Sequence, residues 1–247
     1  MISNRILVAS PLVLALALVM EPRPARATPP DAAAVKRGSR AYGRYCVSCH
    51  GVAGDGRGPS ADWVDPRPRD FTGGTYKFRS TPASELPTDG DILRTLERGL
   101  NHTSMPHWRG VTRRELREAV QYLKSLSPRF AEEQQGTPLP VPPRPAFTPE
   151  LVAKGKEVWG KVQCAGCHGD GGKGNGSSAQ TLRDEWGYPI LPRDFTSGPL
   201  KVGSAPEDLY LAFMAGLTGS PMPSFAESIS PEEAWALVAY VRSLRKD

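Results

Sequence analysis

The chain contains CVSCH at residues 46–50 and CAGCH at residues 164–168, and the four cysteines of these two motifs are its only cysteines. Two thiols three residues apart can bond the two vinyl groups of a porphyrin while the next histidine faces the iron, so Cys-x-x-Cys-His is the attachment signature of c-type haem. The motifs predict two covalently attached haem c groups, bonded through Cys46, Cys49, Cys164 and Cys167.

Two other readings of paired cysteines fit the sequence less well. A thioredoxin-like redox motif needs a βαβ context, and here the flanks are helical and glycine-rich without Val/Ile strand runs. A zinc site built from two knuckles would leave His50 and His168 in identical positions without a shared reason. With haem attached, these two histidines become the proximal iron ligands.

An internal repeat organises the rest of the chain. The motif at Cys46 returns at Cys164, and a helix start at Thr112 returns at Ser230, both after 118 residues. Between these anchors RDFT at 69–72 matches 193–196, Gly-Leu at 99–100 matches 216–217, and Met-Pro at 105–106 matches 222–223. The repeat predicts domain 1 at residues 28–134 and domain 2 at residues 148–247, joined by a proline-rich linker at 135–147.

Both halves resemble class I cytochromes c, and the pair resembles a di-haem periplasmic cytochrome of the cytochrome c4 kind. The resemblance covers nearly the whole chain after residue 27. It implies an all-α fold of two tandem class I cytochrome c domains, each a small helical fold around one covalently bound haem. It also implies a histidine and a methionine as the axial ligands of each iron.

Met105 and Met222 are the predicted distal ligands. They lie at equivalent positions, each before a proline, about 55 residues after the haem histidine. Proline holds the preceding residue in an extended conformation, so the thioether can project from a loop. Met214 has no matching methionine and is expected to pack in the core, whereas His102 and His107 flank Met105 and are expected at the surface, with replacement of Met105 by either as the alternative.

Arg69 and Arg193 recur inside Pro-Arg-Asp-Phe, and Lys77 and Lys201 follow at equal spacing. Haem propionates are carboxylates that need cationic or donor partners when partly buried, so these residues are candidate propionate contacts. The alternative is an Arg-Asp pair that fixes a turn and anchors the following phenylalanine.

Helix signals agree with this architecture. The first helix of each half carries a glycine, Gly38 or Gly155, which would let another helix approach closely or would merely weaken its own helix. The last helices have helical apolar periodicity and open with Thr112 and Ser230, each predicted to form a capping box, and a third box is predicted at Ser204. Gly99 and Gly216 are predicted to end the middle helices.

Residues 1–27 have a basic residue, a short apolar stretch and an Ala-x-Ala site, which predicts a signal peptide and export to the periplasm. A retained N-terminal anchor is the alternative; once the signal is cleaved, we expect no integral membrane protein. The linker is expected either to be a semi-rigid spacer or to wrap over the surface.

The chain has a net charge of +5, but its basic residues are not clustered among aromatics, so we expect no nucleic-acid partner. Residues 28–135 carry 17 basic and 13 acidic side chains, and residues 148–247 carry 10 and 12. We expect a non-enzymatic carrier that passes electrons between redox protein partners, possible partners including a membrane-bound oxidase or reductase. The alternatives are a di-haem peroxidase-like enzyme, which needs one open iron, and a haem subunit of a larger oxidoreductase complex.

Overall fold

The computed structural model describes residues 29–201, 203 and 205–245, so the predicted signal peptide lies outside the described residues. In this part of the chain every regular element is a helix, which confirms the all-α prediction. None of the described helices is long and apolar enough to cross a membrane. The elements are α1 (Ala32–Tyr45), α2 (Val47–His50), η1 (Ala61–Trp63), α3 (Asp89–Arg98), α4 (Arg113–Ser125), α5 (Arg129–Glu132), α6 (Pro149–Lys161), α7 (Ala165–His168), η2 (Ala179–Thr181), α8 (Pro206–Ala215) and α9 (Pro231–Ser243).

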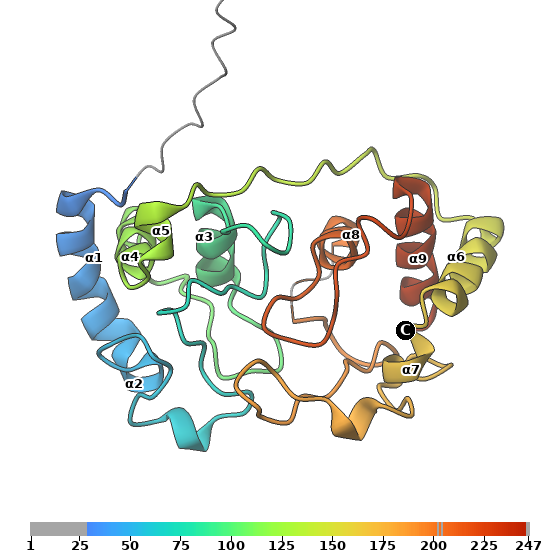
Figure 1. Cartoon of the computed structure of the whole chain (residues 1–247), viewed down its shortest axis with the longest axis horizontal. Helices are drawn as coiled ribbons and strands as arrows, with labels where there is room; N and C mark the ends of the chain where they lie inside the picture. The colour runs from blue at the N-terminus through green and yellow to red at the C-terminus, as the bar shows by residue number, and fades with distance from the viewer. Residues whose placement is uncertain (1–28, 202, 204, 246–247) are drawn as a thin grey trace, which may run out of the picture.

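The two halves lie side by side as similar lobes, with α1 to α5 in one lobe and α6 to α9 in the other (Figure 1). Each lobe has its own apolar core. The core of domain 1 is built around Tyr42, Leu96 and Val120, and that of domain 2 around Trp159, Phe213 and Leu237. The first long helix of each half packs against the last long helix, α1 on α4 and α6 on α9.

Glycine permits these two helix crossings. A Cβ atom on Gly38 would lie 1.9 Å from the carbonyl oxygen of Glu118 in α4, and one on Gly155 would lie 1.9 Å from the carbonyl oxygen of Ala236 in α9. Real Cβ contacts are never this short, so both positions require glycine. The close-approach reading of these residues is confirmed.

The helix caps follow the sequence in part. Ser230 and Glu233 form the full capping box of α9, whereas Thr112 accepts the backbone N–H of Glu115 without the return bond. The box predicted at Ser204 falls on a residue outside the described part of the chain, and the N-cap of α8 is Ala205, which makes no side-chain cap bond. A second full box, Thr88 with Asp91, caps α3, and the sequence pattern did not predict it. Its acid is the shorter aspartate, whereas the usual pattern ends in glutamate or glutamine.

The linker runs along the surface of both lobes, over the top of the view in Figure 1. It begins on domain 1, where the backbone N–H groups of Gly136 and Leu139 donate to carbonyl oxygens at 2.9 and 2.8 Å. Farther along, Leu139 and Val141 pack against the core of domain 2. The wrapping alternative is therefore the one observed.

Candidate functional site: two haem-binding sites

Each haem motif forms a one-turn helix at the end of the first long helix of its domain. α2 follows α1 directly, and α7 follows α6 after a short turn, so the motif is placed by a helix that is itself locked against α4 or α9. All four cysteines are free thiols of intermediate exposure. Burial raises the pKa of Cys46 and of Cys164 to about 11, which keeps these thiols protonated at neutral pH.

A glycine-rich loop wraps back over each motif. In domain 1 the N–H groups of Gly56 and Gly58 donate to the carbonyl oxygens of His50 and Cys49 at 3.0 and 3.1 Å. In domain 2 the matching bonds reach His168 and Cys167 at 2.8 and 3.0 Å. A Cβ on Gly58 would lie 2.4 Å from a carbonyl oxygen of the motif, so the glycines let the loop lie flat on it.

The two histidines are oriented in the same way. The Nδ1–H of His50 donates to the backbone carbonyl of Arg69 at 2.9 Å, and that of His168 donates to the carbonyl of Arg193 at 3.1 Å. These bonds fix the tautomer and leave Nε2 of each ring as the atom available to a metal. Burial lowers the pKa of both histidines, which favours the neutral imidazole that iron needs as a ligand.

The two predicted distal methionines lie on loops with one shared geometry. Gly99 ends α3 and Gly216 ends α8, both at positive φ, as predicted. In each domain the residue after this glycine donates its N–H to the methionine carbonyl at 3.1 Å, closing a loop of equal size around Met105 or Met222. Both methionines are half-buried against the core of their domain. Each is thus presented from a loop of the same kind.

The other candidate residues near these loops lie as expected. Met214 is buried in the core of domain 2, as predicted. His102 and His107 are exposed, and His102 adopts a left-handed backbone conformation with a φ of 56°.

Several buried polar atoms have no hydrogen-bond partner among the described residues, and they indicate that the lobes are built around another group. The hydroxyl of Tyr76, the indole N–H of Trp108, Nε of Arg193 and the hydroxyl of Thr218 are such atoms. Buried donors without acceptors are costly, and haem carboxylates are acceptors. Free cysteine pairs, oriented histidines and unpaired donors together fit a covalently attached haem in each domain.

Arg69 does not form an ion pair with the aspartate of its own turn. The carboxylate of Asp70 accepts from the N–H and hydroxyl of Thr72 at 2.7 and 2.6 Å, so the aspartate fixes the turn without an Arg69 ion pair. The guanidinium of Arg69 instead forms an ion pair with Glu185 of domain 2 at 2.6 Å and stacks on Trp186. The Arg-Asp pair is therefore wrong for Arg69, and contact with a propionate stays a prediction.

Lys77 and Lys201 lie near these arginines. Burial, with Arg69 and Lys201 adding to it, lowers the pKa of Lys77 to about 8, and burial also lowers the pKa of Lys201. The four cations thus come together at the junction of the domains, where a carboxylate of a bound group would stabilise their charges.

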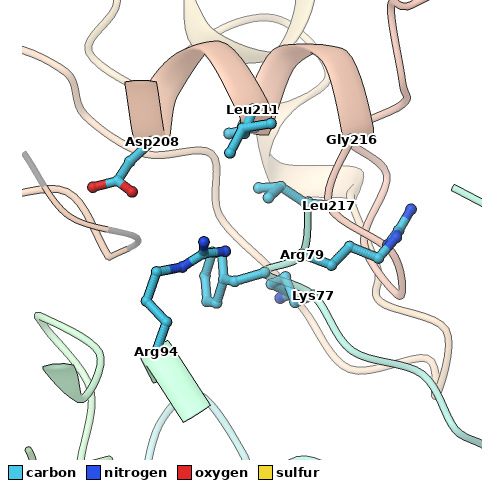
Figure 2. Close-up of a pocket in the computed structure, with 9 residues that line it drawn as sticks. Lys77, Arg79, Arg94, Asp208, Leu211, Gly216 and Leu217 are labelled. Atoms are coloured by element: carbon cyan, nitrogen blue, oxygen red, sulfur yellow. The ribbon is translucent and has the colours of Figure 1, made fainter. Parts of the chain in front are cut away.

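The junction itself contains polar contacts and a small pocket. Asp208 of α8 accepts both its bonds from Arg98 of α3, at 3.1 and 3.0 Å, and the buried Arg79 donates to the carbonyl of Ala215 at 3.1 Å. Figure 2 shows the pocket between α3 and α8, with Asp208 and Leu211 on one wall and Arg94 and Lys77 on the other. The two haem-binding halves are therefore held in one defined arrangement.

Comparison with known proteins agrees with this geometry. The family described as cytochrome c oxidase, cbb3-type, subunit III matches residues 33–123 and again residues 150–241. A chain of the Kuenenia stuttgartiensis reducing HAO-like protein complex is 41% identical in sequence, with a TM-score of 0.84, and the match covers 85% of this chain and 96% of that one.

The cbb3-type cytochrome c oxidase subunit FixP of Sinorhizobium medicae (strain WSM419) is 30% identical over 101 residues. That match covers 38% of this chain and only 30% of the relative, so this chain spans less than a third of that protein. Two matches to one family in tandem, each with its own haem motif, account for most of the chain. The chain belongs to the cbb3-type cytochrome c oxidase subunit III family and is a di-haem cytochrome c of two tandem domains.

Proposed function

We propose that this chain is a periplasmic electron-transfer protein in which each haem is bonded by its cysteine pair and ligated by one histidine and one methionine. The ligands would be His50 with Met105 in domain 1 and His168 with Met222 in domain 2. The observation that carries this is the repetition, in both domains, of a motif helix, a histidine held by a carbonyl and a closed methionine loop.

Bound haem supplies a single-electron ferrous/ferric couple. The residues of the chain then determine how that couple is used. The histidine carbonyl bonds hold each ring in one orientation, and Met105 and Met222 would be the second protein ligands of the iron, which would exclude outside ligands. This arrangement suits electron transfer and disfavours peroxide chemistry, which needs an open position.

We further propose that the chain works as the haem subunit of a larger oxidoreductase. The supporting observation is that one relative is a chain of a reducing HAO-like protein complex and another is an oxidase subunit. The match to the first covers nearly all of that chain, so a whole subunit of that kind is the better analogy. Donor and acceptor would be redox proteins at the outer side of the bacterial inner membrane.

The axial ligands decide between transfer and catalysis, and they can be tested directly. The oxidised protein should show a methionine-sulfur-to-iron charge-transfer band with the intensity of two sites, and the reduced protein should not bind carbon monoxide. Met105→Ala and Met222→Ala should each remove about half of that band and open one iron to ligand. Met214→Leu is the matched control, because this methionine is buried in the core, and it should leave the band unchanged.

An iron without a methionine ligand would support the peroxidase-like alternative. If the wild-type protein shows only half of the band and the spectrum of its first haem responds to His102→Ala or His107→Ala, then Met105 is not the ligand. Binding of carbon monoxide to the wild-type protein would likewise argue against two closed sites.

A further inference from the structure

Arg69 contacts both haem-binding sites. Its carbonyl holds Nδ1 of His50 in domain 1, while its guanidinium reaches Glu185 in domain 2. The guanidinium also borders the methionine loop of domain 2, since a Cβ atom on Gly219 would lie 2.7 Å from Nη1 of Arg69. Gly219 is three residues before Met222, so one arginine connects the histidine of one site to the methionine loop of the other.

Arg193 repeats this arrangement in the opposite direction. Its carbonyl holds Nδ1 of His168, and its Nη2 lies 3.4 Å from Nε2 of His102 in domain 1. His102 is three residues before Met105 and is the counterpart of Gly219 in the repeat. The two arginines therefore cross at the junction, each from its own histidine to the methionine loop of the other domain.

The connections made by Arg69 and Arg193 differ in strength because the loop before Arg193 in domain 2 is longer than the loop before Arg69 in domain 1. Five residues separate η1 from Arg69, whereas eleven separate η2 from Arg193, and the additional length includes the hairpin 183–189. Asp184 closes this hairpin by accepting the N–H groups of Trp186 and Tyr188 at 3.0 and 2.9 Å. The hairpin thereby places the carboxylate of Glu185 and the indole ring of Trp186 against Arg69. Among the described residues, domain 1 places no such pair of groups against Arg193.

The hairpin also supplies negative charge next to the Arg69 guanidinium. The side chains of Arg69 and Glu185 are 16% and 33% exposed, so their ion pair is partly shielded from water. Burial lowers the pKa of Arg69, and Glu185 and Asp184 oppose this shift by stabilising its positive charge. Removing the carboxylate of Glu185 leaves the positive charge of Arg69 less compensated beside the histidine of domain 1.

We propose that Arg69 and Arg193 are positioning residues that couple the two haem sites across the junction, with hairpin 183–189 making the Arg69 connection the dominant one. The proposal rests on the His/Met ligation proposed above. Its consequence is that the reduction equilibrium of haem 1 depends on residues of domain 2.

The first test is Glu185→Gln, which removes one charge with almost no change of shape. The less compensated charge of Arg69 favours the ferrous form, so the reduction equilibrium of haem 1 should shift toward reduction on the order of tenfold, which is about 59 mV for one electron. Glu133→Gln is the control, because it breaks an exposed Arg129–Glu133 pair within domain 1, and it should shift the equilibrium less than about twofold. The measurement is a redox titration followed by NMR through the ligand-methyl signals of Met105 and Met222, assigned with the alanine variants.

The second test perturbs the Arg69–Glu185 pair from the methionine loop of domain 2. Gly219→Ala would place a Cβ 2.5 Å from Oε1 of Glu185 and should displace the pair, shifting the Met105 methyl signal of the other domain. Gly160→Ala is the control, because a Cβ on this residue of α6 meets no atom within 4 Å, so it should leave that signal in place.

Equal haem 1 equilibria in Glu185→Gln and Glu133→Gln would overturn the coupling, as would a larger shift at haem 2 than at haem 1. An unmoved Met105 signal in Gly219→Ala would also overturn it. Failure of the proposed function is a separate result, because a wild-type protein without two ligand-methyl signals would lack His/Met ligation before any variant is made.

Discussion

Replacement of Gly155 by alanine tests the helix crossing that holds the second haem motif. α6 leads into Cys164 and packs on α9 at Gly155, where an added Cβ would lie 1.9 Å from the carbonyl oxygen of Ala236 and 2.7 Å from Cβ of Tyr240. Ordinary contact begins at 3.4 Å, so the two backbones would have to separate by about 1.5 Å. Neither atom belongs to the flexible end of a side chain, so the strain cannot be relieved by a change of side-chain conformation.

Overpacking of this kind typically costs about 1–3 kcal/mol, and rigid backbone on both sides places Gly155→Ala near about 3 kcal/mol. For a domain of roughly 100 residues, 1 kcal/mol corresponds to about 4–8 °C in Tm. The unfolding of domain 2 should therefore move down by more than about 10 °C. Because α6 positions the haem motif, the Met222 share of the charge-transfer band should disappear in the same transition.

Gly160→Ala is the matched control in the same helix. A Cβ at Gly160 meets no atom within 4 Å, so alanine there should stabilise the helix by up to about 1 kcal/mol. Thermal unfolding of the oxidised holoprotein, followed by circular dichroism and by the charge-transfer band, compares the two variants. A Tm for Gly155→Ala within about 2 °C of the wild type, or equal losses in both variants, would refute the reasoning.

Three further predictions concern the domains, their junction and their partner. Replacing Cys164 and Cys167 by serine should leave one haem, on domain 1, when the exported protein is weighed by mass spectrometry, because each domain has its own complete set of elements; loss of both haems would contradict independent assembly. Asp208→Asn should weaken the junction by about 1–3 kcal/mol, since this buried carboxylate accepts two bonds from Arg98, and no change in chemical denaturation would argue against it. The more basic domain 1 should receive an acidic partner, so electron transfer should slow as salt rises from low to physiological concentration, and a rate independent of salt would exclude electrostatic steering.

The sequence alone determined the features that depend on local chemistry. Two Cys-x-x-Cys-His motifs require haem because the spacing of thiols and histidine matches the porphyrin edge and the iron. The end of α3 and the start of α9 follow from Gly99 and Ser230, whose backbone freedom or hydroxyl acts within a few residues. The repeat predicted two domains, and the resemblance to class I cytochromes c implied that both are all-α.

Caps without a strong local signal were harder to predict. Ser204 fits the sequence pattern of a box but lies outside the described residues, and α8 has Ala205 as its N-cap and Pro206 at its first helical position. Thr88 was overlooked because aspartate is an uncommon partner in such a box, although its carboxylate accepts the N–H of Thr88 at 3.0 Å.

The contacts between the domains were decided only by the tertiary structure. Nothing near Arg69 in the chain indicates that its carbonyl supports His50 while its guanidinium pairs with Glu185, 116 residues away. The path of the linker over both lobes was likewise decided only by the tertiary structure. The packing of the two domain cores determines which partner a long side chain at the junction can reach. Such partners are far apart in the sequence, so no local sequence pattern indicates that they will meet.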